Sequence, residues 1–75
     1  MEEILGTLPL DETKSVYLIK KSHYDTTYLD LRVFFNRKDS EPLPSKKGVI
    51  LRVDQWNELL PGLMQGMNIE LVDAE

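Results

Sequence analysis

The sequence predicts an α+β fold: a curved, four-stranded antiparallel sheet followed by one C-terminal helix, in the order ββββα, with the helix packed on one face of the sheet. Two observations support this prediction. Across residues 3–52, four short segments rich in aliphatic, β-branched and aromatic residues are separated by polar, turn-like stretches. From residue 53 onwards, apolar residues recur every three to four positions, which is typical of a helix with one apolar face.

The first two strands are expected in the N-terminal third of the chain. Residues 3–8, EILGTL, suit a short strand in which Gly6 is a weak point or a bulge. Residues 14–21, KSVYLIKK, have the composition of a second strand. The polar stretch 22–27 that follows suits a hairpin connection, so the second strand should pair with the third.

The third strand, residues 27–35, has the clearest pattern, because its side chains alternate between two different faces. One face is apolar and is expected to meet the core: Leu29, Leu31, Val33 and Phe35. The other face carries Asp30 and Arg32 between two aromatic residues, which is more typical of a working surface than of solvent cover. Phe34 and Phe35 are adjacent, so their rings point to opposite faces and one of them must leave the main core.

The C-terminal half begins with a long polar loop, 36–47, and a short fourth strand, 48–52. A helix should follow, with Asp54 favourably placed at its N-terminal end. Pro61 predicts a kink or a break near Leu60, because proline cannot donate the backbone hydrogen bond of a regular helix. Residues 68–75 form a tail that either frays or adds a short edge strand. Four apolar helix residues are assigned to core or dimer packing: Trp56, Leu60, Leu63 and Met64.

The length of 75 residues indicates a single domain, 1–75, with a small core. A chain of this size buries only about 60% of its unfolded surface. The sequence contains no cysteine, so disulfides cannot add stability, and a homodimer is the expected source of further buried apolar area. We see no secretion signal and no apolar run of the roughly 20 residues that span a bilayer. A cytoplasmic protein without a membrane partner is therefore expected.

The charge is unevenly distributed along the chain. The formal net charge is −4, which argues against a nucleic-acid partner. All nine Lys and Arg residues nevertheless lie within residues 14–52, whereas both ends of the chain are acidic. A locally positive surface is compatible with this distribution, since the local potential steers a polyanion. Scattered solubilising lysines remain the alternative interpretation.

The sequence does not predict an enzyme. His23 is the only histidine, and neither a catalytic triad nor a set of metal ligands accompanies it. No glycine-rich phosphate loop is present, and no cofactor or metal is expected. Proteins that bind single strands instead combine basic residues with exposed aromatic rings on which bases stack. The chain offers such residues at the first hairpin, on the third strand and in the loop after it.

Three motifs carry a family resemblance: YLDLRVFF (28–35), PSKKGVIL (44–51) and DQWNEL (54–59). In this order and spacing they resemble the positive cofactor four family of transcriptional coactivators, over roughly residues 14–63. The resemblance implies a homodimer that binds single-stranded or melted DNA in the grooves of its curved sheets, with little sequence preference. It also implies a role in transcription regulation, replication or repair, alongside the corresponding machinery.

The same resemblance assigns the nucleic-acid-binding residues. Lys46 and Lys47 would contact phosphates, Arg32 would reach the backbone or a base, and Phe35 would stack on a base. The first hairpin would contribute three further residues: Lys21, His23 and Tyr24. The sequence leaves DNA or RNA open as the ligand. By the same resemblance the protein would be nucleoid-associated in a bacterium and nuclear in a eukaryote.

The chain departs from the family pattern at several positions. Tyr24, Asp25 and Thr26 stand where the family tends to place lysines, so the first hairpin would hold fewer phosphates. Pro61 and Gly62 interrupt a helix that the family uses in dimerisation. These departures and the acidic ends keep an alternative open: a dimeric protein–protein interaction adaptor of the same fold, with little affinity for nucleic acid.

Overall fold

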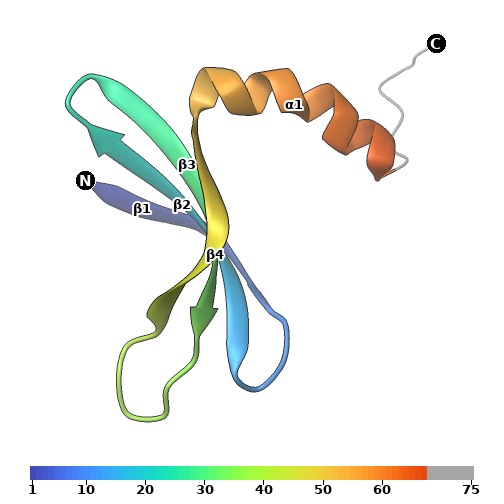
Figure 1. Cartoon of the computed structure of the whole chain (residues 1–75). Coiled ribbons are helices and arrows are strands. Elements are labelled where there is room, and N and C mark those ends of the chain that lie inside the picture. The colour runs from blue at the N-terminus through green and yellow to red at the C-terminus, as the bar shows by residue number, and fades with distance from the viewer. Residues whose placement is uncertain (68–75) are drawn as a thin grey trace.

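The computed structural model describes residues 1–67 and confirms four antiparallel strands followed by one helix (Figure 1). The elements are β1 (Glu2–Pro9), β2 (Lys14–His23), β3 (Thr26–Phe35), β4 (Leu43–Arg52) and α1 (Val53–Gly66). The strands lie in the order β1-β2-β3-β4, so each strand pairs with its neighbour in the chain. The predicted tail, 68–75, lies outside the described residues.

Strands β2 and β3 form an unbroken hairpin that pairs Lys14 with Phe35 at one end and His23 with Thr26 at the other. The expected connection, 22–27, is therefore too long, because only Tyr24 and Asp25 form the turn. Tyr24 has a φ of 56°, in the left-handed region that tight two-residue hairpin turns require. This short turn fixes the register, and with it the face of the sheet that each β2 residue occupies.

Strand β4 begins earlier than the sequence indicates. The predicted loop 36–47 ends at residue 42, because Leu43 and Pro44 pair with Phe35 and Phe34. A proline is tolerated here because β4 is an edge strand. Gly48 pairs with Arg32, so the three residues 45–47 bulge opposite a single β3 residue. Lys46 and Lys47 therefore lie on a bulged strand. The polar composition of this part of β4 is typical of a loop, which is why the sequence did not predict a strand here.

The chain buries little apolar surface by itself. Within residues 1–67, Ile19 is the only buried apolar side chain, and every residue of β1 is exposed. On the apolar face of β3, which we expected to meet the core, Leu31 and Phe35 are exposed. The physical reason is the position of α1, which extends away from the sheet instead of covering this face (Figure 1). The predicted helix therefore meets the sheet near its first turn but does not cover the apolar face (Figure 1).

Helix α1 is joined to the sheet near its first turn. The Trp56 indole Nε1–H donates a hydrogen bond to the Leu29 carbonyl on β3, at 2.8 Å. The helix continues through Pro61 to Gly66, so a break at this position is wrong, whereas a kink stays a prediction. Trp56 and Met64 are half-buried, but Leu60 and Leu63 are exposed within the chain. No helix within residues 1–67 has the length and apolar character needed to cross a bilayer.

Candidate nucleic-acid interface

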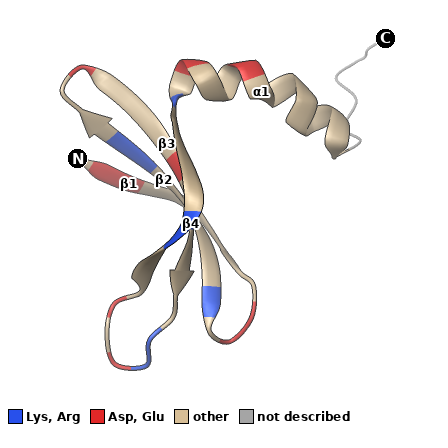
Figure 2. Cartoon of the chain, viewed as in Figure 1, with Lys and Arg blue, Asp and Glu red and all other residues tan. Residues whose placement is uncertain are grey.

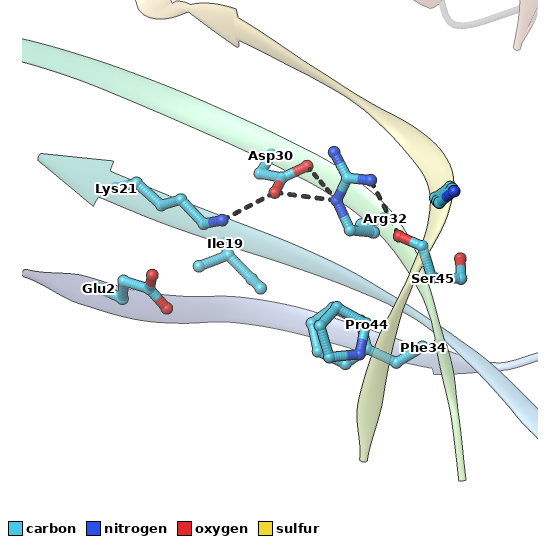
Figure 3. Close-up of a pocket in the computed structure, with 9 residues that line it drawn as sticks. Glu2, Ile19, Lys21, Asp30, Arg32, Phe34, Pro44 and Ser45 are labelled. Carbon is cyan, nitrogen blue, oxygen red and sulfur yellow. Dashed lines mark hydrogen bonds and ion pairs between the residues drawn. The ribbon is translucent and has the colours of Figure 1, made fainter.

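A hollow on one face of the sheet, here termed the groove, draws residues from all four strands (Figure 3). Alternation along β2 and β3 brings Ile19, Lys21, Asp30, Arg32 and Phe34 to the same face, because Ile19 pairs directly with Asp30. The remaining lining residues come from the edge strands: Glu2, Pro44, Ser45 and Lys46. The groove is therefore a mixed surface of charged groups around an aromatic ring.

Asp30 lies at the floor of the groove and is only 1% exposed. Its carboxylate accepts a hydrogen bond from Lys21 Nζ at 2.9 Å and from Arg32 Nε at 3.1 and 3.2 Å. Burial raises the pKa of the Asp30 carboxyl, but the hydrogen bonds from Lys21 and Arg32 outweigh it and hold that pKa below its usual value. The carboxylate thus fixes two cations of neighbouring strands at the centre of the groove.

Arg32 also links the groove to the bulge of β4 (Figure 3). Its Nη1–H donates to the Ser45 carbonyl at 3.0 Å. The Ser45 hydroxyl donates to the Val33 carbonyl at 2.7 Å and accepts from the Lys47 backbone N–H at 3.1 Å. These contacts hold the three bulged residues against β3, which sets the position of Lys46 at the rim of the groove.

The aromatic part of the groove is formed by β2 and β3. Phe34 lines it, and the Tyr17 ring lies against Phe34 with the ring centroids 4.4 Å apart and the planes tilted by 38°. An aromatic pair of this geometry is favourable beyond its buried area and gives the ring a defined orientation. Phe34 is half-buried, so part of its surface remains available to a ligand.

The structure brings three of the predicted binding residues together in the groove: Lys21, Arg32 and Lys46. The others lie elsewhere. Phe35 is 43% exposed and points to the opposite face of the sheet, by the alternation of β3. Lys47 lines a separate, mostly apolar hollow beside Val49. His23 and Tyr24 lie at the β2–β3 turn, where their rings pack edge to face with the ring centroids 4.4 Å apart.

Several groove residues were not among the predicted site residues, including Glu2, Asp30, Phe34 and Ser45. The alternation of β3 places Asp30 and Phe34 on one face, but the pairing of the two edge strands, which brings Glu2 and Ser45 to the groove, has no local signal. The register of the β2–β3 hairpin was also missing. A two-residue turn at Tyr24 and Asp25 fixes the pairing of β2 with β3, in which Asp30 lies opposite Ile19 and Arg32 lies opposite Tyr17. Since the turn was expected to be longer, the faces of β2 could not be assigned from the sequence.

The electrostatic character of the groove is only weakly positive. Three basic residues line it together with two acidic residues, Asp30 and Glu2. Figure 2 shows further acidic residues on α1, and the acidic start of β1 lies beside the two adjacent lysines of β2. Of the nine basic residues of the chain, only three line the groove, so the local positive charge is smaller than the sequence indicates.

Comparisons with known proteins bear on the family and the fold of this chain. A family model described as transcriptional coactivator p15 (PC4) matches residues 8–61. The chain is 53% identical over 32 residues to the RNA polymerase II transcriptional coactivator KIWI of Arabidopsis thaliana. That match covers 43% of this chain and 29% of the plant protein, so it spans less than a third of the relative's length.

Two solved structures share the fold. The crystal structure of a PC4 homolog from Burkholderia pseudomallei superimposes with a TM-score of 0.75 at 15% identity, over 87% of this chain and 88% of that chain. A bacteriophage T5 homolog of the eukaryotic coactivator PC4, implicated in recombination-dependent DNA replication, gives a TM-score of 0.66 at 18% identity. This match covers 91% of this chain and 76% of the phage chain.

Proposed function

The chain belongs to the transcriptional coactivator p15 (PC4) family, and we propose that it binds single-stranded DNA in the groove, without enzymatic activity. The observation that carries this proposal is the grouping of Lys21, Arg32 and Lys46 around the Phe34 ring. Cations spaced around a partly exposed aromatic ring suit a strand whose phosphates and base faces are both accessible.

The three basic residues of the groove differ in how much of each side chain is free for a phosphate. Arg32 uses Nε on Asp30 and Nη1 on Ser45, and within residues 1–67 its Nη2 makes no hydrogen bond or ion pair (Figure 3). Lys46 lines the groove and makes no ion pair within the same residues. Lys21 keeps about a third of its side chain exposed while it contacts Asp30. A phosphate can therefore be held by charge-assisted hydrogen bonds without dismantling the Asp30 contacts.

The biological setting that we propose is transcription regulation, replication or repair, each of which exposes single strands. The Arabidopsis relative is a transcriptional coactivator, and the phage homolog is implicated in recombination-dependent DNA replication. Single-stranded RNA offers the same phosphates and base faces and is a second ligand to test, because none of the groove contacts selects for or against a 2′-hydroxyl.

We further propose that the protein acts as a homodimer. The face opposite the groove exposes Leu31, Phe35 and Val49, and α1 exposes Leu60 and Leu63, the latter at 55%. A chain that buries one apolar residue within its described part has little core to stabilise a monomer. A second copy that covers these surfaces would supply the missing core and would double the number of grooves.

Fluorescence anisotropy with a labelled oligothymidine tests the binding proposal directly. We expect the single strand to bind more tightly than a duplex of the same length, with an affinity that falls as salt increases. The slope of log K against log salt should be about −0.7 for each phosphate neutralised. Equal or tighter binding of the duplex would contradict the proposal. Sedimentation at micromolar concentrations tests the homodimer, and a monomer across that range would contradict it.

One observation favours the alternative function, a dimeric protein–protein adaptor. The groove carries two acidic residues beside its three basic ones, which weakens its attraction for a polyanion. The same anisotropy titration separates the two functions. Dissociation constants only in the millimolar range for oligothymidine and for single-stranded RNA, from a folded dimer, would favour the adaptor.

A further inference from the structure

We infer that Glu2 is a specificity-determining residue, which keeps phosphates away from the β1 side of the groove and confines a bound strand to the β3–β4 side. This inference rests on the proposed function, because it concerns the path of a nucleic acid in the same groove. It assigns an active role in recognition to an acidic edge strand that otherwise only completes the sheet.

The register of β1 places Glu2 beside a groove cation. Glu2 pairs with Lys21 and Glu3 pairs with Lys20, so two adjacent acids oppose two adjacent lysines. Directly opposed residues of an antiparallel pair lie about 4.5–5.5 Å apart, and their side chains share one face. Glu2 and Lys21 both line the groove, whereas alternation directs the Glu3 and Lys20 side chains to the opposite face (Figure 3).

The residue before Glu2 is anchored to β2 by two hydrogen bonds. The Ser22 N–H donates to the Met1 carbonyl at 3.0 Å. In return, the Met1 ammonium donates to the Ser22 carbonyl at 3.3 Å. These two contacts hold the residue before Glu2 in the β1–β2 ladder, and Glu2 is thereby kept opposite Lys21.

The two acidic residues of the groove differ in what they do to a ligand. Asp30 is buried, and its charge is matched by direct contacts with Lys21 and Arg32. The Glu2 side chain is exposed, and within residues 1–67 its carboxylate makes no hydrogen bond or ion pair. Its carboxylate therefore leaves an unmatched negative charge at the β1 edge.

This charge makes the groove asymmetric. A phosphate that approaches Lys21 meets the Glu2 carboxylate on the adjacent strand. On the β3–β4 side, Arg32 and Lys46 line the groove beside the neutral Ser45 and Pro44. Because phosphates are attracted to regions of positive potential, the backbone of a bound strand should run along Arg32 and Lys46.

The test compares two variants with the same change of charge, Glu2→Gln and Glu3→Gln. Removal of the Glu2 charge should make Lys21 available as one further phosphate contact. The slope of log K against log salt should then steepen by about 0.7, the value for one more phosphate contact on a single strand. If that contact contributes nothing at 1 M salt, the same slope makes binding of oligothymidine about fivefold tighter at 0.1 M salt. Glu3→Gln should change the affinity less than twofold.

A second variant shows whether the tighter binding of Glu2→Gln requires the Lys21 side chain. In a Lys21→Met background, Glu2→Gln should change the affinity less than twofold. Equal tightening by Glu2→Gln and Glu3→Gln would show an effect of net charge alone and would overturn the inference, as would the absence of any gain from Glu2→Gln. If the parent protein does not bind oligothymidine, the proposed function falls as well. If the parent binds but the two glutamine variants behave alike, only this inference falls.

Discussion

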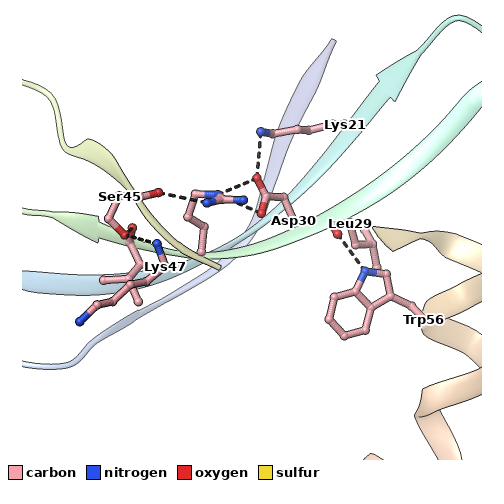
Figure 4. Close-up of polar contacts among 8 residues, drawn as sticks. Lys21, Leu29, Asp30, Ser45, Lys47 and Trp56 are labelled. Carbon is pink, nitrogen blue, oxygen red and sulfur yellow. Dashed lines mark hydrogen bonds and ion pairs between the residues drawn. The ribbon is translucent and has the colours of Figure 1, made fainter. Parts of the chain in front are cut away.

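Lys46 and Lys47 are adjacent in the sequence, but they line hollows on opposite faces of the sheet. Lys46 lies in the groove with Lys21 and Arg32. Lys47 lies beside Val49 in the apolar hollow of the other face, and its backbone N–H is bonded to the Ser45 hydroxyl (Figure 4). The lysine pair therefore offers one cation to the groove of each chain, not the two that the sequence predicts.

This separation leads to unequal effects of two otherwise identical substitutions. Lys46→Ala should reduce the salt slope of oligothymidine binding by about 0.7 and weaken binding about fivefold at 0.1 M salt, since one phosphate contact is lost. Lys47→Ala should change the affinity less than twofold. Anisotropy titrations at four or more salt concentrations measure both quantities. An equal loss from the two variants would show that the ligand contacts both faces of the bulge.

The two adjacent phenylalanines provide a second matched pair. Phe34→Ala removes the ring that lines the groove, and base stacking on an aromatic side chain contributes about 1–3 kcal/mol. We therefore expect binding to weaken at least fivefold with little change in the salt slope. Phe35→Ala, on the opposite face, should instead weaken the homodimer. Anisotropy and sedimentation separate these effects, and the opposite result would place the stacking ring at Phe35, as the family resemblance implies.

The buried carboxylate of Asp30 predicts a pH dependence of stability. Because its pKa is lowered in the folded protein, the stabilisation is present above the unfolded value of 3.8 and is lost as the pH falls through the folded value. Asp30→Asn should lower the free energy of unfolding by about 1–3 kcal/mol at pH 7 and should flatten its dependence on pH below 4. Urea unfolding at several pH values measures both effects.

An exposed aspartate provides the control for this experiment. Asp54 also contacts an arginine, Arg52, at 3.2 Å, but both side chains are largely exposed. Asp54→Asn should therefore cost less than about 1 kcal/mol at pH 7, as is usual for surface ion pairs. An equal loss of stability from the two variants would contradict the role of burial at Asp30.

Gly48 is required by the close approach of β4 to β3. A Cβ atom at this position would lie 2.8 Å from both Arg32 Cα and the Leu31 carbonyl oxygen. Since the clash is with backbone atoms, Gly48→Ala should displace β4, lower the stability and weaken DNA binding through Arg32. Gly62→Ala is the matched control, because a Cβ there meets nothing within 4 Å and the helix should gain about 1 kcal/mol. Thermal unfolding of both variants tests the difference, and an unchanged Gly48→Ala protein would contradict it.

The order of the elements was predictable because each strand and the helix has its own local pattern. The alternation of β3 identified Asp30 and Arg32 as one face, and the structure confirms that both line the groove. The limits of β4 were not predictable, because the pairing of Leu43 and Pro44 with β3 depends on a distant strand and overrides the turn-like composition. The separation of Lys46 from Lys47 has the same cause, since it follows from the bulge.

The surface on which α1 packs was also not predictable from local sequence patterns. The apolar spacing of Trp56, Leu60 and Leu63 indicates a face that requires a partner, but it does not say which surface provides it. Within the described chain, Trp56 contacts β3 and the two leucines remain exposed. The assignment of this face to core or dimer packing therefore stays a prediction for the two leucines, and within residues 1–67 Trp56 alone of the three is joined to the sheet by a hydrogen bond.

Pro61 interrupts the hydrogen bonding of α1 without ending the helix. Its nitrogen cannot donate to the Asn57 carbonyl, and an interior proline costs about 3 kcal/mol relative to alanine. Pro61→Ala should therefore raise the stability by up to about 3 kcal/mol and increase the helical circular dichroism. Sedimentation then shows what the proline contributes to assembly. If the homodimer persists, the proline is only a cost to the helix, as we expect. A more helical but monomeric Pro61→Ala protein would contradict this and would show that the proline shapes the contact with the second copy.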